Sequence, residues 1–292
     1  MSTAPPLRRG TTALPDGRRL GWGEWGPEDG AVVLYCPGAG MSARLGFGGA
    51  LLDELAVRLI ALERPGLGRS DPAPDRALSD FAEDVRALIT ARGLGAPAIV
   101  GFSAGAPFAL ACAAAGLVSA VAVVSGTDEL ARSAPSALSP EVRALIERVA
   151  ADPAGAEAYF AQLSAETLLA MVTQMSSEAD RAVYGEPSFA QAFSEALAEG
   201  FAQGAAGYAR DTVLTMRRWP FEPSRIAAPV ALWYGERDAS PVHSPDRGAS
   251  LCRRIPGAHR HLLDAGGALL WTHARAILTS LLEDAARDRR RG

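Results

Sequence analysis

A serine lies at the centre of the pentapeptide Gly101-Phe102-Ser103-Ala104-Gly105, directly after a short apolar run and directly before a helix-like stretch. Glycines two residues before and two residues after a serine are typical of a sharp strand-to-helix turn, because larger side chains would collide there. Such a turn presents the hydroxyl at a helix N-terminus, where developing negative charge is favoured. The spacing therefore predicts that Ser103 is a nucleophile for acyl carbons.

The composition excludes several other kinds of chemistry. All 29 positively charged side chains are arginines, so a Schiff-base lysine, a phosphate-loop lysine and a Ser-Lys dyad are excluded. The formal net charge of -4 argues against nucleic acids and anionic membranes as partners. The three cysteines lie far apart in the sequence, which indicates neither a disulfide framework nor a zinc site. We expect no metal and no cofactor.

The first ten residues lack the apolar stretch of a signal peptide, and no apolar run approaches the length of a membrane span. We therefore expect a cytoplasmic protein without a membrane partner. The sequence does not indicate the oligomeric state.

Short apolar runs alternate with helix-like segments, which is typical of a parallel sheet covered by helices on both faces. The segment 17–25 alternates between apolar and polar residues, as an antiparallel edge hairpin does. The expected strands are residues 31–35, 59–62, 98–100, 120–124, 230–234 and 260–263, and the expected helices of the sheet layers are residues 49–57, 80–91, 106–115 and 269–283.

The long interval between residues 128 and 223 contains no convincing strand and is too long for a loop. It predicts helices at residues 140–150, 154–175, 188–203 and 208–217. We therefore expect an α/β core of residues 1–128 and 224–292, with residues 129–223 inserted as a helical cap over the carboxyl edge of the sheet.

Together these features resemble the α/β-hydrolase fold over residues 12 to 283, and in particular the small-molecule hydrolases with an inserted helical cap. The landmarks occur in the order of that family. They are Cys36-Pro37-Gly38-Ala39-Gly40 after a strand, the glycine-rich loop Arg64 to Ser70, the serine turn, and Leu232 to Asp238.

The resemblance implies an oxyanion site made of backbone N–H groups. Ala104 follows the nucleophile and is the first expected donor, and the loop at Gly38 and Ala39 is expected to supply the second. Cys36 occupies a position where many relatives have histidine, and we expect it to be a small buried side chain rather than a second nucleophile.

Asp238 is the expected acid that orients a catalytic histidine, because it follows directly on a predicted strand. Its alternative role is a loop aspartate that pairs with Arg237 or caps the next helix. Asp128 is the reserve candidate for the acid, although the start of a cap helix suits it better.

The resemblance places the catalytic histidine between the last strand and the final helix, at Gly267 or, preferably, Ala268, and neither is titratable. We expect the four histidines of the chain to be structural or on the surface. His243 and His261 are the first to test, ahead of His259 and His273.

Three hypotheses follow. The first is a serine hydrolase of esters, thioesters or related acyl compounds with an empty histidine position, as in an inactivated variant. The second is a natural non-hydrolytic enzyme of secondary metabolism, namely a cyclase, lyase, dehydratase or decarboxylase. The third is a non-catalytic ligand binder. In each case we expect a mainly apolar small molecule, contacted by Phe102, Met171, Met175, Tyr208 and Trp219.

Overall fold

The computed structural model describes residues 3–290, so the first two and last two residues of the predicted core lie outside the described chain. One eight-stranded sheet has the order β1-β2-β4-β3-β5-β6-β7-β8. β1 and β2 form an antiparallel hairpin at one edge, and the other neighbouring strands from β4 to β8 run parallel. The strands are β1 (Arg8–Ala13), β2 (Arg19–Trp25), β3 (Ala31–Cys36), β4 (Val57–Leu62), β5 (Ala98–Phe102), β6 (Ala120–Val124), β7 (Val230–Gly235) and β8 (His259–Leu263).

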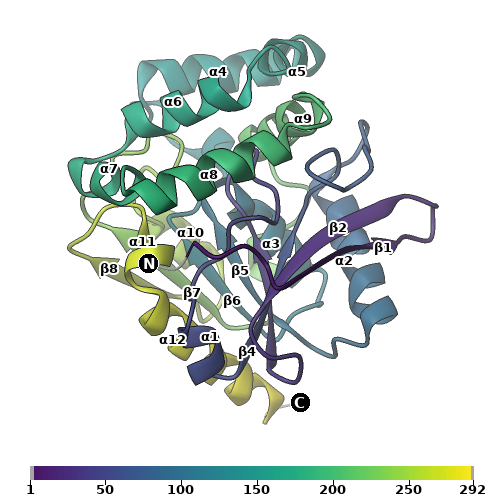
Figure 1. Ribbon diagram of the computed structural model, residues 1–292. Coiled ribbons are helices and arrows are strands. Elements are labelled where there is room, and N and C mark those ends of the chain that lie inside the picture. The colour runs from purple at the N-terminus through teal and green to yellow at the C-terminus, as the bar shows by residue number, and fades with distance from the viewer. Residues whose placement is uncertain (1–2, 291–292) are drawn as a thin grey trace.

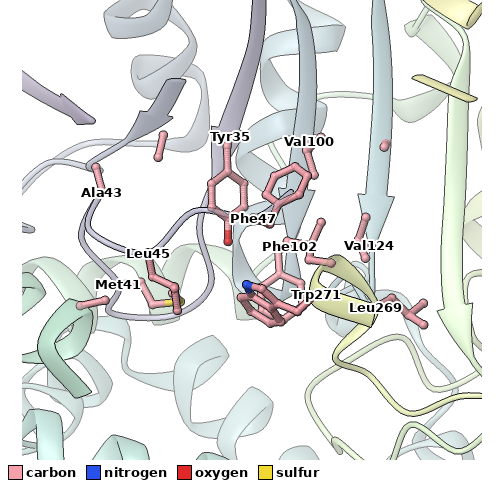
Figure 2. Close-up of a cluster of buried hydrophobic side chains, with 14 of the residues drawn as sticks. Tyr35, Met41, Ala43, Leu45, Phe47, Val100, Phe102, Val124, Leu269 and Trp271 are labelled. Atoms are coloured by element: carbon pink, nitrogen blue, oxygen red, sulfur yellow. The ribbon is translucent and has the colours of Figure 1, made fainter. Parts of the chain in front are cut away.

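Alternate residues of each central strand face opposite sides of the sheet, and helices cover both sides (Figure 1). Val33 and Tyr35 of β3 pack in one core with Leu269 and Leu278, whereas Leu34 packs in the other core. Figure 2 shows part of the first core. The covering helices are α1 (Leu51–Glu54), α11 (Leu269–Thr272) and α12 (Ala274–Arg289) on the first face, and α2 (Leu78–Arg92), α3 (Ala106–Ala114) and α10 (Ala249–Arg254) on the second.

A helical layer is inserted between β6 and β7 and lies at the top of Figure 1. It contacts the loops that follow the carboxyl ends of β3 and β4, since Ser42 N–H donates to the carbonyl of Ala196 and Gly68 N–H to that of Gly200. Its helices are α4 (Pro140–Ala151), α5 (Pro153–Phe160), α6 (Ala165–Met175), α7 (Glu178–Tyr184), α8 (Pro187–Gly200) and α9 (Ala206–Met216).

Two predicted helices are interrupted. The predicted helix 154–175 is two helices, because the Ser164 hydroxyl accepts a hydrogen bond from Thr167 N–H and starts α6 anew. The predicted helix 269–283 is divided at His273, whose φ of -129° is not helical. α7, which begins at a similar serine cap, Ser177, was not predicted from the sequence. Among the helices of residues 3–290, none combines the length and the hydropathy that crossing a bilayer requires.

Candidate active site

Ser103 occupies the turn between β5 and α3 in a left-handed backbone conformation, with φ of 50°. A non-glycine residue in this conformation is strained, and such strain often occurs at functional turns. The two flanking glycines have a steric reason: a Cβ on Gly101 would lie 2.7 Å from Cα of Ala106, and one on Gly105 would lie 2.1 Å from the carbonyl oxygen of Cys36. The predicted strand-to-helix turn at Ser103 is therefore present.

His243 lies between Ser103 and Asp238. Its Nε2 atom is 2.9 Å from the Ser103 hydroxyl oxygen, and its Nδ1 atom is 2.7 Å from a carboxylate oxygen of Asp238. Because a carboxylate accepts, Nδ1 carries the proton and the lone pair of the neutral imidazole faces the hydroxyl. The expectation that Ser103 lacks an imidazole partner is therefore wrong.

A tight turn brings His243 back towards Asp238. Pro241 follows Ser240, and the N–H of His243 donates to the carbonyl of Ser240 at 3.3 Å, as in a β-turn with proline at its second position. The next residue fastens the loop to the core, since Ser244 N–H donates to the carbonyl of Gly126 after β6. A proline three residues after the predicted acid, Asp238, was the sequence signal for this placement.

The side chain of Asp238 is buried, and its neighbours favour the carboxylate form. Burial alone would raise the pKa of its carboxyl, but the adjacent His243 and the N–H of Ser240 stabilise the carboxylate and hold the pKa below its ordinary value. Asp128, the reserve candidate, contacts Ser250 and Arg254 instead.

The loop after β3 lies directly against the nucleophile turn. A Cβ on Gly105 would lie 2.5 Å from the carbonyl oxygen of Pro37, so the missing side chain allows the two backbones to approach. The predicted oxyanion donors are thus on two adjacent segments. Their roles stay predictions for Ala104, Gly38 and Ala39. Cys36 is buried, and burial raises the pKa of its thiol to about 12, which makes it a poor nucleophile.

Residues 33–279 match the model of a family described as the alpha/beta hydrolase family. The chain belongs to this family. One curated relative, a non-heme chloroperoxidase of Streptomyces lividans, is 35% identical over 99 residues. That match covers 33% of this chain and 36% of the chloroperoxidase, so it spans about a third of either protein.

Solved structures of other α/β hydrolases superimpose on nearly the whole chain. A bromoperoxidase from Bacillus anthracis has a TM-score of 0.69 at 17% identity, covering 95% of this chain and 99% of the other. An enol-lactonase from Burkholderia xenovorans has a TM-score of 0.67 at 19% identity, covering 95% and 100%. A putative aryl esterase from Burkholderia cenocepacia has a TM-score of 0.65 at 22% identity, covering 96% and 100%. These similarities show the α/β-hydrolase fold.

Gly267 and Ala268, where the α/β-hydrolase resemblance implied a histidine, contribute backbone hydrogen bonds instead. The N–H groups of Gly267 and Ala268 donate to the two carboxylate oxygens of Asp180, from α7, at 2.9 and 2.8 Å. A Cβ on Gly267 would lie 2.9 Å from the carboxylate of Asp238. The prediction that Ala268 or Gly267 marks the imidazole position is thus corrected: the imidazole that approaches Ser103 comes from the loop after β7.

The remaining histidines of this α/β hydrolase pack elsewhere. His261 stacks on Trp233 of the neighbouring strand, with ring centroids 3.8 Å apart. His259 lies beside Asp284 of α12, and His273 contacts the hydroxyl of Thr272.

The predicted substrate contacts of this α/β hydrolase divide into three groups. Phe102 packs edge-on against Trp271 in the buried cluster of Figure 2, and Tyr208 is buried against Phe201. Met171 is one of the exposed large apolar side chains, and Met175 is partly buried. Trp219 stacks on Phe221 in the core that holds α3 and α10, whereas Phe102 and Tyr208 lie in the other core, and the role of Trp219 as a substrate contact stays a prediction.

Proposed function

We propose that the protein is a serine hydrolase that cleaves esters, thioesters or lactones of small, mainly apolar molecules, with Ser103, His243 and Asp238 as its catalytic residues. The observation that carries this proposal is the continuous hydrogen-bonded series from the Ser103 hydroxyl through His243 to the carboxylate of Asp238. The enol-lactonase and the putative aryl esterase among the structural relatives support the same reaction class.

In the first half of the reaction, Ser103 attacks the acyl carbon while Nε2 of His243 takes the hydroxyl proton. The carbonyl oxygen of the substrate becomes an oxyanion, which the N–H groups of Ala104 and of the loop at Gly38 and Ala39 stabilise. Asp238 keeps the imidazole in the productive tautomer and stabilises it once it is positively charged. His243 then gives its proton to the leaving group, at the oxygen of an alcohol or the sulfur of a thiol.

In the second half, a water molecule takes the place of the alcohol. His243 removes a proton from this water, which attacks the acyl-enzyme carbonyl, and a second oxyanion forms at the same donors. Its collapse breaks the bond to Ser103 and releases the carboxylic acid. The hydroxyl of Ser103 regains its proton from His243.

The inserted helices, within residues 129–223, act as the cap that covers the substrate. This is supported by α9, which packs against the Ser103–Gly105 turn, and by Leu168 and Phe201, which lie against Gly40 of the loop after β3. These apolar neighbours favour an apolar acyl or alcohol group. The non-hydrolytic enzyme and the ligand binder both rested on a missing histidine, and no contact of the site favours either of them.

The experiment has two parts. Purified protein is assayed with p-nitrophenyl esters of increasing acyl length and with a set of lactones, and it is labelled with a fluorophosphonate probe. We expect hydrolysis and labelling at residue 103, both abolished in Ser103→Ala. A folded wild-type protein that neither hydrolyses any of these compounds nor reacts with the probe would overturn the proposal.

A further inference from the structure

A fully buried arginine holds the backbone of the loop after β3. Arg64, which follows β4, donates from one terminal nitrogen to the carbonyl of Pro37 at 2.6 Å and from the other to the carbonyl of Gly38 at 2.8 Å. Its Nε atom donates to Asp211 of α9 at 2.5 Å. A buried guanidinium is costly unless it is paired and hydrogen-bonded, and here all three of its nitrogens have partners.

These contacts fix the direction of two peptide planes. Among the described residues there is no cis peptide bond, so in each plane the N–H points away from the carbonyl. One planar guanidinium draws the carbonyls of Pro37 and Gly38 to the same side. The N–H groups that share those planes, on Gly38 and Ala39, therefore point to the opposite side, away from Arg64.

We propose that Arg64 is a positioning residue for the oxyanion site, acting through the peptides of Gly38 and Ala39, with Asp211 holding the guanidinium in register. This inference rests on the proposed function, because it assigns a task within the acyl-transfer reaction. Arg64 itself is separated from the substrate by the peptides that it binds.

The charge of Arg64 adds to its effect on geometry. A cation at a carbonyl oxygen polarises the peptide and makes the N–H of the same plane a stronger donor. Asp211 also pairs with buried Arg76, so the cluster of Arg64, Arg76 and Asp211 places one carboxylate between two guanidinium groups, of which only Arg64 contacts the loop.

The cluster also connects the loop to two elements that define the site. Asp211 belongs to α9, which packs against the Ser103–Gly105 turn. The Arg64 guanidinium lies over the ring of Phe108 of α3, 5.0 Å from its centroid. The oxyanion donors, the nucleophile turn and the inserted helices are thus held to one another through a single side chain.

The test compares Arg64→Gln and Arg64→Lys with Arg76→Gln, a matched control that loses an equally buried arginine of Asp211 but no contact to the loop. A glutamine or a lysine cannot bind two carbonyls and a carboxylate in one plane. For both Arg64 variants we expect kcat to fall by about 10² to 10³, with KM changed by less than about threefold. Asp211→Asn should show a smaller loss of the same kind.

A second readout isolates the oxyanion. A trifluoromethyl ketone of the best ester substrate forms a tetrahedral adduct on Ser103, and its affinity should fall by the same factor as kcat in the Arg64 variants, whereas the affinity of the product carboxylate should not change. Melting curves establish that each variant is folded, and Arg64→Lys serves if Arg64→Gln does not fold. Arg64 variants that match Arg76→Gln in kcat and in ketone affinity would overturn the inference. An inactive wild-type protein would instead count against the proposed hydrolase.

Discussion

The Nε2 atom of His243 lies 2.9 Å from the hydroxyl oxygen of Ser103, although 140 positions of the chain separate the two residues. His243 is only five positions from Asp238, whose carboxylate it contacts through its other nitrogen. The acid and the imidazole therefore come from one loop, and that loop meets the serine turn at the carboxyl edge of the sheet.

Replacing His243 with alanine should reduce kcat on p-nitrophenyl acetate by about 10⁶, because Ser103 loses the group that accepts its proton. Labelling by a fluorophosphonate should be lost in parallel. The matched control is His273→Ala, which removes an imidazole that contacts Thr272 at the end of α11, and it should keep wild-type activity. A His243→Ala enzyme as active as the control would show that another base serves Ser103.

A histidine placed at Ala268 should not raise activity. Ala268 is buried, and its N–H is bound to Asp180, so an imidazole there would displace the neighbouring core before it could reach Ser103. We expect Ala268→His to be less stable and less active than the wild type in melting and ester assays. The decisive comparison is the double variant His243→Ala/Ala268→His: recovery of activity above that of His243→Ala alone would contradict this prediction.

Asp180→Ala should destabilise the protein by about 2 to 4 kcal/mol, because the buried N–H groups of Gly267 and Ala268 lose their acceptor. Activity should fall as well, since Gly267 lies against the carboxylate of Asp238. The control is Asp152→Ala, which removes an exposed cap of α5 and should cost about 1 kcal/mol. Urea unfolding measures the free energy of unfolding of both variants. Equal decreases in this free energy for Asp180→Ala and Asp152→Ala would refute a special role of Asp180.

Asp128→Asn should gain stability relative to the wild type as the pH rises. Burial raises the pKa of the Asp128 carboxyl in the folded state, so its stabilising contribution is complete below the unfolded-state pKa and is lost as the pH rises through the folded-state value. An asparagine does not titrate, so the variant does not lose this stability as the pH rises. In urea unfolding between pH 3 and pH 7, the free energy of unfolding of the variant minus that of the wild type should increase.

The control for this pH dependence has the opposite sign. Hydrogen bonds from Arg18 lower the pKa of exposed Asp16, so its contribution is present above the unfolded-state pKa and is lost as the pH falls through the folded-state value. Asp16→Asn should therefore lose stability relative to the wild type as the pH rises. The same slope in both variants would mean that the buried environment of Asp128 has no effect of its own.

The elements that depend on local pattern were predictable from the sequence. The apolar run before Gly101 and the helix-like run after Gly105 predicted the nucleophile turn, and the strand before Asp238 predicted the position of the acid. Both features follow from periodicity and glycine placement within about fifteen residues. The order of these landmarks was sufficient for the fold.

The position of the imidazole was not predictable in the same way. It depends on the turn at Pro241, which is local, but also on the hydrogen bond from Ser244 to Gly126, which joins parts of the chain on either side of the inserted helices. The spacing of residues in the sequence alone did not predict that the imidazole of His243 faces Ser103. The break between α5 and α6 was missed for a simpler reason, because the cap at Ser164 lies inside an otherwise continuous helical pattern.

The shared loop of Asp238 and His243 has a consequence for how the activity is inherited. Because the carboxylate and the imidazole lie five positions apart on one segment, a single stretch of chain can be gained, lost or transplanted with both groups together. The segment after β8 then supplies no imidazole to Ser103, and its backbone instead binds Asp180 and lies against Asp238. A rule that expects histidine after the last strand would classify such a chain as a pseudoenzyme, although its serine, imidazole and carboxylate are hydrogen-bonded in series.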